Sequence, residues 1–288
     1  MSRYRSVTAH LRGVLCAVAS TLLIVCADAV SKLVVGGGDA PAAEFMAVRA
    51  ALALPLVVAI AAATGGTRGL APRAPAISLL RAAIALAVTV LVILALTALP
   101  FAECLALIFT APLMIVALSG PLLGERPGAR RWIAVAVGFA GALVVLRPRF
   151  ADHGAAALLP LAAALGVALQ DIVTRRAPAS ETSLSLLLVT MLVTAFGGTA
   201  WTLAAGWTPM TQDALLVTAA GAAVIALAFL ANIVALSLLG ASTVAPLRYL
   251  SLVWAVPVGW LVWGETPDLA ALAGGALIVA AGLLAARR

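Results

Sequence analysis

Charged residues are rare in this sequence. Only 10% of its 288 residues are Asp, Glu, Lys or Arg, whereas a soluble domain carries roughly 25%. Hydrophobic residues make up 64%, and the mean hydropathy is +1.17. A water-soluble fold could not bury that much apolar surface, so the shortage of charge excludes an ordinary soluble protein. The bilayer is the expected solvent for nearly all of the chain.

Cysteine and histidine are also scarce, with three and two residues respectively. Cys16, Cys26 and Cys104 lie inside apolar runs, without Cys-x-x-Cys spacing and without histidine neighbours. This pattern argues against a disulfide framework and against a zinc site. We expect no metal and no cofactor.

Common catalytic signatures are missing as well. The sequence contains no His-Glu-x-x-His, no Gly-x-Ser-x-Gly, no Walker A loop and no Gly-x-Gly-x-x-Gly. We therefore expect that the protein is not an enzyme and does not use ATP directly. A membrane-embedded enzyme without a recognisable motif stays open as an alternative.

Basic residues, in contrast, outnumber acidic ones by 18 to 11, which gives a net charge of +7. In a soluble protein this surplus would suggest nucleic acid. Here the basic residues lie between hydrophobic runs and form no stripe interleaved with aromatic residues. We predict no nucleic-acid partner and interpret the basic residues as signals of membrane topology.

Polar, Gly and Pro residues divide the chain into ten hydrophobic runs. The first run follows three arginines, as in a signal peptide, but it is too long for a signal core, so we expect a retained span. The predicted spans are 11–34, 43–63, 78–97, 101–121, 131–147, 154–174, 182–204, 214–237, 241–262 and 268–286. The predicted fold class is therefore an all-α integral membrane protein with ten transmembrane helices.

The distribution of Lys and Arg predicts the orientation, because positively charged loops stay cytoplasmic. With a cytoplasmic N-terminus, thirteen basic residues fall on inside segments and three on outside segments, so both termini should be cytoplasmic in a cell inner membrane. The inside residues are Arg3, Arg5, Arg12, Arg68, Arg73, Arg81, Arg126, Arg130, Arg131, Arg175, Arg176, Arg287 and Arg288. The outside residues are Lys32, Arg147 and Arg149.

Internal repetition divides the chain into two five-helix halves, 1–150 and 151–288. The matching segments are Asp28–Lys32 with Asp171–Arg175, Pro41–Glu44 with Pro178–Glu181, Ala95–Thr97 with Ala235–Ser237, and Gly124–Pro127 with Gly264–Pro267. The last two pairs share one offset of 140 residues, from Ala95 to Ala235 and from Gly124 to Gly264. Five spans per half is an odd number, so the second copy should run inverted. Inverted repeats with a substrate site near the midplane are typical of secondary transporters.

Two five-helix halves, each with a Gly-Glu turn before a last helix rich in small residues, resemble the EamA family of the drug/metabolite transporter superfamily. The segments that carry the likeness are Ala111–Pro112, Gly124–Pro127, Gly138–Gly141, Arg248–Leu252, Gly264–Glu265, Gly274–Gly275 and Gly282. The resemblance covers essentially the whole chain. It implies ten helices in an inverted repeat, cytoplasmic termini, a central cavity, and movement of amino acids, nucleoside-like metabolites, vitamins or drugs. One departure from a strict repeat is Pro112, whose offset-matched residue is Leu252; the second half has prolines at 246 and 257 instead.

Ionisable groups inside apolar spans are costly and usually face a partner or a watery cavity. Their positions along the predicted helices suggest two polar clusters at opposite depths that open alternately as gates. The clusters are Asp28, Arg49 and Glu103 on the outer side, and Asp171, Asn232 and Arg248 on the inner side.

The alternative for these charges is purely structural. Asp28 would pair with Lys32, and Asp171 with Arg175, each four residues along one helix. Arg49 and Arg248 would then extend to the interface or bond to backbone. For the matched glutamates we also expect structural roles: Glu44 and Glu181 at the starts of the second and seventh helices, and Glu125 and Glu265 at their turns.

Four further side chains are candidates to line a substrate cavity: Gln170, Phe109, Tyr249 and Trp254. Packing or lipid contact is the alternative for each aromatic ring. Together these features predict a secondary transporter for a small metabolite, surrounded by membrane lipid, with protons as a candidate coupling ion. A channel is a further alternative, although the sequence shows no rings of like charge.

Overall fold

The structure is a computed structural model that describes residues 2–63, 69–98, 107–146, 156, 158–178, 180–264 and 269–286. Within these ranges every regular element is a helix. Their bounds are α1 (Ser2–Val34), α2 (Ala42–Ala63), α3 (Pro75–Ala98), α5 (Ala111–Leu123), α6 (Ala129–Leu146), α7 (Leu158–Arg176), α8 (Ser183–Ala205), α9 (Gln212–Leu238), α10 (Ala241–Val244), the 3-10 helix η3 (Ala245–Tyr249), α11 (Leu250–Trp263) and α12 (Leu269–Ala286). Glu103 and Glu265 lie outside the described residues.

Seven described segments are long and apolar enough to cross a membrane. They are Thr8–Val34, Ala42–Ala63, Pro75–Val92, Leu158–Arg176, Ser183–Ala205, Gln212–Leu238 and Ala241–Val262, and they are accompanied by the shorter apolar helices Ala111–Leu123 and Leu272–Ala281. Large apolar side chains also cover the outside, with Phe196 and Leu269 more than four-fifths exposed at 81% and 83%. Such a surface suits lipid rather than water, and the chain is a multi-pass membrane protein.

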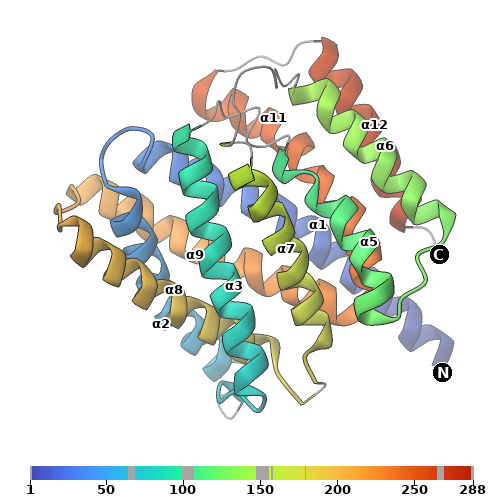
Figure 1. Ribbon diagram of the computed structural model, residues 1–288, viewed down its shortest axis with the longest axis horizontal. Coiled ribbons are helices and arrows are strands. Elements are labelled where there is room, and N and C mark those ends of the chain that lie inside the picture. The colour runs from blue at the N-terminus through green and yellow to red at the C-terminus, as the bar shows by residue number, and fades with distance from the viewer. Residues whose placement is uncertain are drawn as a thin grey trace.

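The main helix contacts join the first part of the chain to the second. α1 lies along α9 and α3 lies along α7, while α2 packs on α8 and α6 packs on α12. α5 contacts α7, and α11 contacts α1. In Figure 1, α6 and α12 form one flank of the bundle, and α2 and α8 form the opposite flank. The interior is therefore built from side chains of both halves.

Glycines allow two of these helix pairs to approach closely. At Gly198 in α8, an added Cβ would lie 2.8 Å from the backbone nitrogen of Ala47 in α2. At Gly141 in α6, it would lie 2.8 Å from the carbonyl oxygen of Gly274 in α12. Both distances are too short for a real Cβ atom. Small residues therefore allow the close approach of these helices.

The glycines of the two Gly-Glu pairs have the same backbone geometry. Gly124 ends α5 with φ of 67°, and Gly264 ends α11 with φ of 70°. In each case the glycine N–H donates to carbonyl oxygens of the preceding helical turn. Residues with a Cβ rarely adopt this left-handed conformation, so glycine is the residue that stops the helix here.

The predicted span 241–262 matches a segment long and apolar enough to cross a membrane, Ala241–Val262, but it is not one continuous α-helix. This segment consists of the four-residue α10, the 3-10 helix η3 and then α11. Pro246 lies in the first turn of η3. Because proline has no N–H and its ring crowds the preceding turn, an α-helix cannot pass through it unchanged. The tighter winding of η3 redirects the side chains that follow, including Arg248 and Tyr249.

Candidate functional site

An ion pair in the interior joins η3 to α7. Arg248 Nη2 donates to Asp171 Oδ1 at 2.7 Å and to Oδ2 at 2.6 Å. The same nitrogen lies 3.4 Å from Asn232 Oδ1 in α9. The Asp171 side chain is 3% exposed and the Arg248 side chain is 20% exposed. The structure thus brings together the three residues that the sequence analysis groups as the inner cluster.

Arg81 in α3 belongs to the same polar region. It is 1% exposed, so this residue, counted with the inside segments in the sequence analysis, lies in the interior of the bundle. Its Nε donates to Thr174 Oγ1 at 2.7 Å, and its Nη1 donates to Thr190 Oγ1. Asp171 also acts on Arg81 electrostatically. Because α3 begins at Pro75 and not near residue 78, Arg81 lies about 9 Å along the helix instead of at its end.

We refer to six residues as the Arg81–Arg248 network: Arg81, Asp171, Thr174, Thr190, Asn232 and Arg248. They come from α3, α7, α8, α9 and η3. The two threonine hydroxyls donate onward to the carbonyl oxygens of Gln170 and Leu186, each at 2.7 Å. Polar groups inside a membrane protein need such partners, because lipid supplies none. Within the network, Arg248 Nε is buried and has no hydrogen-bond partner.

The structural alternative for Asp171 is wrong, because Arg175 points elsewhere. Arg175 Nη1 donates to the carbonyl oxygens of Leu236 at 3.4 Å and Ser237 at 3.1 Å, at the end of α9. Its Nε lies 4.0 Å from Glu125 Oε1. A residue from η3, distant in sequence, is therefore the ionic partner of Asp171.

The predicted outer cluster is described in part. Asp28 in α1 and Arg49 in α2 are close enough to interact electrostatically. Arg49 Nη1 donates to Ser31 Oγ at 3.0 Å, and its guanidinium carbon lies 4.8 Å from the centre of the Phe45 ring. Glu103, the third expected member, lies outside the described residues. Two helices thus contribute opposite charges to one region here as well.

The four predicted cavity residues have different surroundings. Tyr249 is fully buried, its hydroxyl donates to the Phe109 carbonyl oxygen at 3.0 Å, and the two ring centres are 5.8 Å apart. Both residues belong to the hydrophobic core, so in this conformation they pack instead of lining an open cavity. Trp254 Nε1 donates to Thr21 Oγ1 at 3.1 Å, which links α11 to α1. Gln170 is half-buried in α7.

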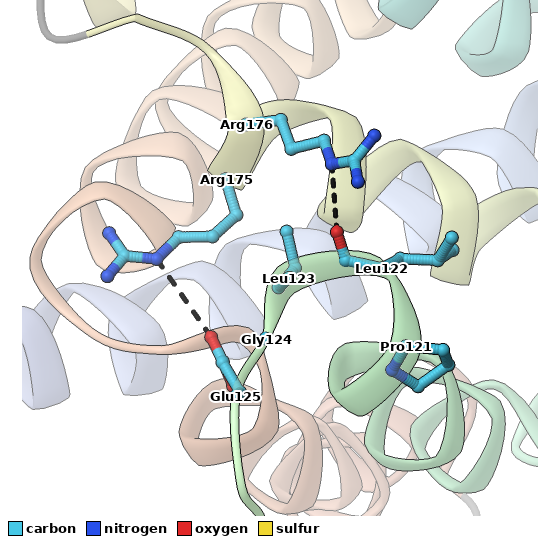
Figure 2. A pocket seen from close by; sticks show the side chains of 7 residues that line it. All are labelled: Pro121, Leu122, Leu123, Gly124, Glu125, Arg175 and Arg176. Carbon is cyan, nitrogen blue, oxygen red and sulfur yellow. Dashed lines mark hydrogen bonds and ion pairs between the residues drawn. The ribbon is translucent and has the colours of Figure 1, made fainter.

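A pocket of about 610 Å³ lies between the ends of α5 and α7, at what we call the Glu125 end of the bundle. Its lining residues are Pro121, Leu122, Leu123, Gly124, Glu125, Arg175 and Arg176. Figure 2 shows Arg175 turned toward Glu125, and Arg176 turned toward Leu122, whose carbonyl oxygen accepts a hydrogen bond of 2.9 Å from Arg176 Nε. The two arginines thus hold the helix ends around the pocket.

Glu125 connects the turn after α5 to the start of α10. Its carboxylate accepts hydrogen bonds from the Ala241 N–H at 3.0 Å, the Ser242 N–H at 3.2 Å and Ser242 Oγ at 2.6 Å. Arg131 Nη1 also donates to Ser242 Oγ, at 2.7 Å. The first N–H groups of a helical segment have no partner within it, and the carboxylate supplies one. Glu125 therefore serves another segment, and the expectation that it acts at its own turn is wrong.

Glu44 and Glu181, which match in the sequence repeat, also reach into the opposite half. Glu181 Oε2 accepts from the N–H groups of Arg73 at 2.9 Å and Ala74 at 2.6 Å, directly before α3. Glu44 Oε2 accepts from the Thr208 N–H at 3.2 Å, in the segment before α9. Glu44 lies in the first turn of α2 as predicted. Glu181 does not cap α8, because the next residue is the N-cap of that helix.

The model of the EamA-like transporter family matches the chain twice, over residues 11–147 and 154–287. A riboflavin transporter from Rhizobium johnstonii is 34% identical over 194 residues, which are 67% of this chain and 64% of the relative. An S-adenosylmethionine uptake transporter from Rickettsia prowazekii is 31% identical over 176 residues, 61% of this chain and 59% of the relative. The pseudopaline exporter CntI from Pseudomonas aeruginosa is 28% identical over 190 residues, with 63% and 64% covered. The chain spans less than two thirds of the length of these relatives.

A solved crystal structure superposes on nearly the whole chain. The TM-score is 0.83, with 98% of this chain and 99% of the other covered, at 22% identity. At that identity the likeness shows the fold alone. The two ranges matched by the family model include both Gly-Glu turns and both terminal helices rich in small residues, on which the sequence resemblance is based. The chain therefore belongs to the EamA-like transporter family.

Proposed function

We propose that this protein is a secondary transporter that moves a small metabolite across an inner membrane by alternating access. In this proposal, ten transmembrane helices form two inverted five-helix repeats, and both termini are cytoplasmic. The relatives are named for riboflavin transport, S-adenosylmethionine uptake and pseudopaline export. They differ in cargo and direction, and what they have in common supports a carrier of small molecules.

The observation that carries the proposal is the broken segment from α10 to α11 and the ion pair that it makes. Discontinuous helices form the substrate and ion sites of many secondary transporters. Here η3 delivers Arg248 to Asp171 and Asn232 in the interior. A static bundle would be as stable with apolar residues in these positions. A charge pair that forms in one state and opens in another gives the buried charges a function.

The helix contacts support the inverted repeat. In the proposed repeat, α1 corresponds to α7, α3 to α9, and α5 to α11. The contact of α1 with α9 then corresponds to the contact of α7 with α3, and the contact of α5 with α7 corresponds to that of α11 with α1. All of these contacts occur. The pairs α2 with α8 and α6 with α12 map onto themselves. Gly124 and Gly264, and likewise Glu44 and Glu181, follow the same exchange. Five spans in each copy would place the copies in opposite orientations.

The two clusters are the proposed gates. The Arg81–Arg248 network and the hydrogen bonds of Glu125 close the Glu125 end in this conformation. The opposite gate would consist of Asp28, Arg49 and Glu103, and the central cavity would be lined by Gln170, Phe109, Tyr249 and Trp254 after the helices rearrange. One gate opens only while the other is closed, which prevents a continuous pore.

Transport by purified protein in proteoliposomes tests the proposal. A metabolite panel that includes riboflavin, S-adenosylmethionine and amino acids would be assayed with and without a proton gradient. We expect at least one cargo whose flux saturates with concentration and shows counter-exchange. Flux that neither saturates nor exchanges would identify a channel, and absence of flux for the whole panel would contradict the proposal.

A further inference from the structure

The Arg81–Arg248 network contains two guanidinium groups and one carboxylate. Arginine stays protonated in proteins, so the network has a net charge of +1 when Asp171 is ionised. The hydrogen-bond partners of Arg81 are the hydroxyls of Thr174 and Thr190, which are neutral dipoles. Within the network, the carboxylate of Asp171 is the one negative charge that attracts both arginines. Because an unbalanced charge among membrane helices is costly, this arrangement favours one additional negative charge.

Within the network, Arg248 has a hydrogen-bond donor that is not used. Its Nε is buried without a partner, while both Asp171 oxygens are bonded to a single nitrogen, Nη2. The Arg248 side chain is one-fifth exposed, and that of Asp171 is almost fully covered. A guanidinium carries five N–H donors, and the one on Nε can donate to an oxygen of an anion without displacing Asp171. An incoming anion would therefore meet Arg248 first.

We propose that the transported molecule carries a carboxylate group and that this group docks on Arg248, with the charge of Arg81 completing the balance. This inference rests on the proposed transport function. A carboxylate contributes one negative charge, which neutralises the network. A phosphate monoester contributes about −1.5 to −2 at neutral pH, and its excess charge would face Asp171. A carboxylate is therefore the better fit.

The test compares binding of acids with binding of their amides to the full-length protein in lipid nanodiscs. The probes are amino acids and amino-acid amides, benzoate and benzamide, and inorganic phosphate. We expect at least one acid to bind about tenfold more tightly than its amide, as expected for a charged hydrogen bond. Arg248→Gln and Arg81→Gln should each reduce this ratio to about one. Arg126→Gln, the same change in an exposed turn, should leave it unchanged.

Melting of each variant shows whether it is folded, and Arg248→Lys provides a second variant that keeps the charge but loses the planar fork. It should retain part of the preference for the acid. Equal binding of acid and amide, preferential binding of phosphate, or no binding of any acid would overturn the inference. Flux of a cargo without a carboxylate, abolished by Arg248→Gln, would overturn it and leave the transport proposal intact. Selective acid binding without flux would support the docking site and contradict transport.

Discussion

Asp171 is the residue at which the two arginines of the network meet. It accepts two hydrogen bonds from Arg248 and interacts electrostatically with Arg81. Its side chain is almost completely covered, so water cannot replace the carboxylate if it is lost. Removing one partner of a buried ion pair typically costs about 3–5 kcal/mol, because the other charge remains buried.

We therefore predict that Asp171→Asn lowers the free energy of unfolding by about 3 kcal/mol. The amide preserves the shape of the side chain, and the loss of charge is the main change. Unfolding in detergent, followed by tryptophan fluorescence, would measure this difference. Asp213→Asn provides a matched control, because Asp213 is exposed in the first turn of α9. Equal losses in the two variants would contradict the electrostatic role of Asp171.

The sequence predicts part of this site. Asp171, Asn232 and Arg248 are polar residues in apolar runs at similar predicted depths, and their grouping needs only helix lengths and the repeat. Arg81 was missed because its helix begins three residues earlier than expected, at Pro75. Thr190 gives no sequence signal, because threonine is common in membrane helices and its bond to Arg81 depends on how α3 and α8 pack.

At the scale of elements, hydropathy predicts most helix bounds to within a few residues, because bilayer thickness fixes how long an apolar run must be. Hydropathy does not distinguish a 3-10 turn from an α-helical turn, so the break between α10 and α11 was missed. Hydropathy also carries no information on helix starts that are capped by side chains distant in the sequence. Glu181 and Glu125 are acidic residues near helix ends, and only the fold shows that they serve α3 and α10.

Glu125 should control access to the interior from its end of the bundle. We predict that Glu125→Gln speeds labelling of a cysteine at Gln170 several-fold, because an amide binds the start of α10 less strongly than a carboxylate does. A membrane-impermeant thiol reagent would be used in a chain whose three cysteines have been replaced. Asp213→Asn, at the start of α9, is the control. An unchanged labelling rate would show that Glu125 does not hold this end closed.

The close contact between α2 and α8 requires a residue without a Cβ atom at position 198. We predict that Gly198→Ala lowers the free energy of unfolding by about 1–3 kcal/mol, because its Cβ would meet backbone atoms of Ala47 that cannot move independently. The control is Gly275→Ala in α12, where an added Cβ has open space. Both changes raise helix propensity by about 1 kcal/mol, so the difference in melting isolates packing. Equal melting temperatures would contradict the close approach.

At the scale of the whole molecule, the start of α1 and the end of α12 lie at the same end of the bundle (Figure 1). The Lys and Arg distribution predicts that this end is cytoplasmic. The segment after α8, which begins at Gly206, should then face the other compartment. The even number of predicted spans and the proposed inversion both require this arrangement.

Reporter fusions test it. Green fluorescent protein fused to the C-terminus should fluoresce, and alkaline phosphatase at the same position should be inactive, because it folds only outside the cytoplasm. Phosphatase inserted at Gly206 should be active. If fusions to the two chain ends report different compartments, the inverted repeat is wrong.

The partners of Arg81 also bear on biosynthesis. Thr174 and Thr190 follow it by 93 and 109 residues, so the ribosome delivers α3 to the insertion machinery well before either hydroxyl exists. Arg81 lies about 9 Å from the start of α3, so its long side chain can extend to the headgroup region while its partners are absent. Until α7 and α8 emerge, the guanidinium of Arg81 needs substitute partners, such as water or lipid headgroups. The native surroundings of Arg81 are therefore complete only after the second part of the chain has inserted.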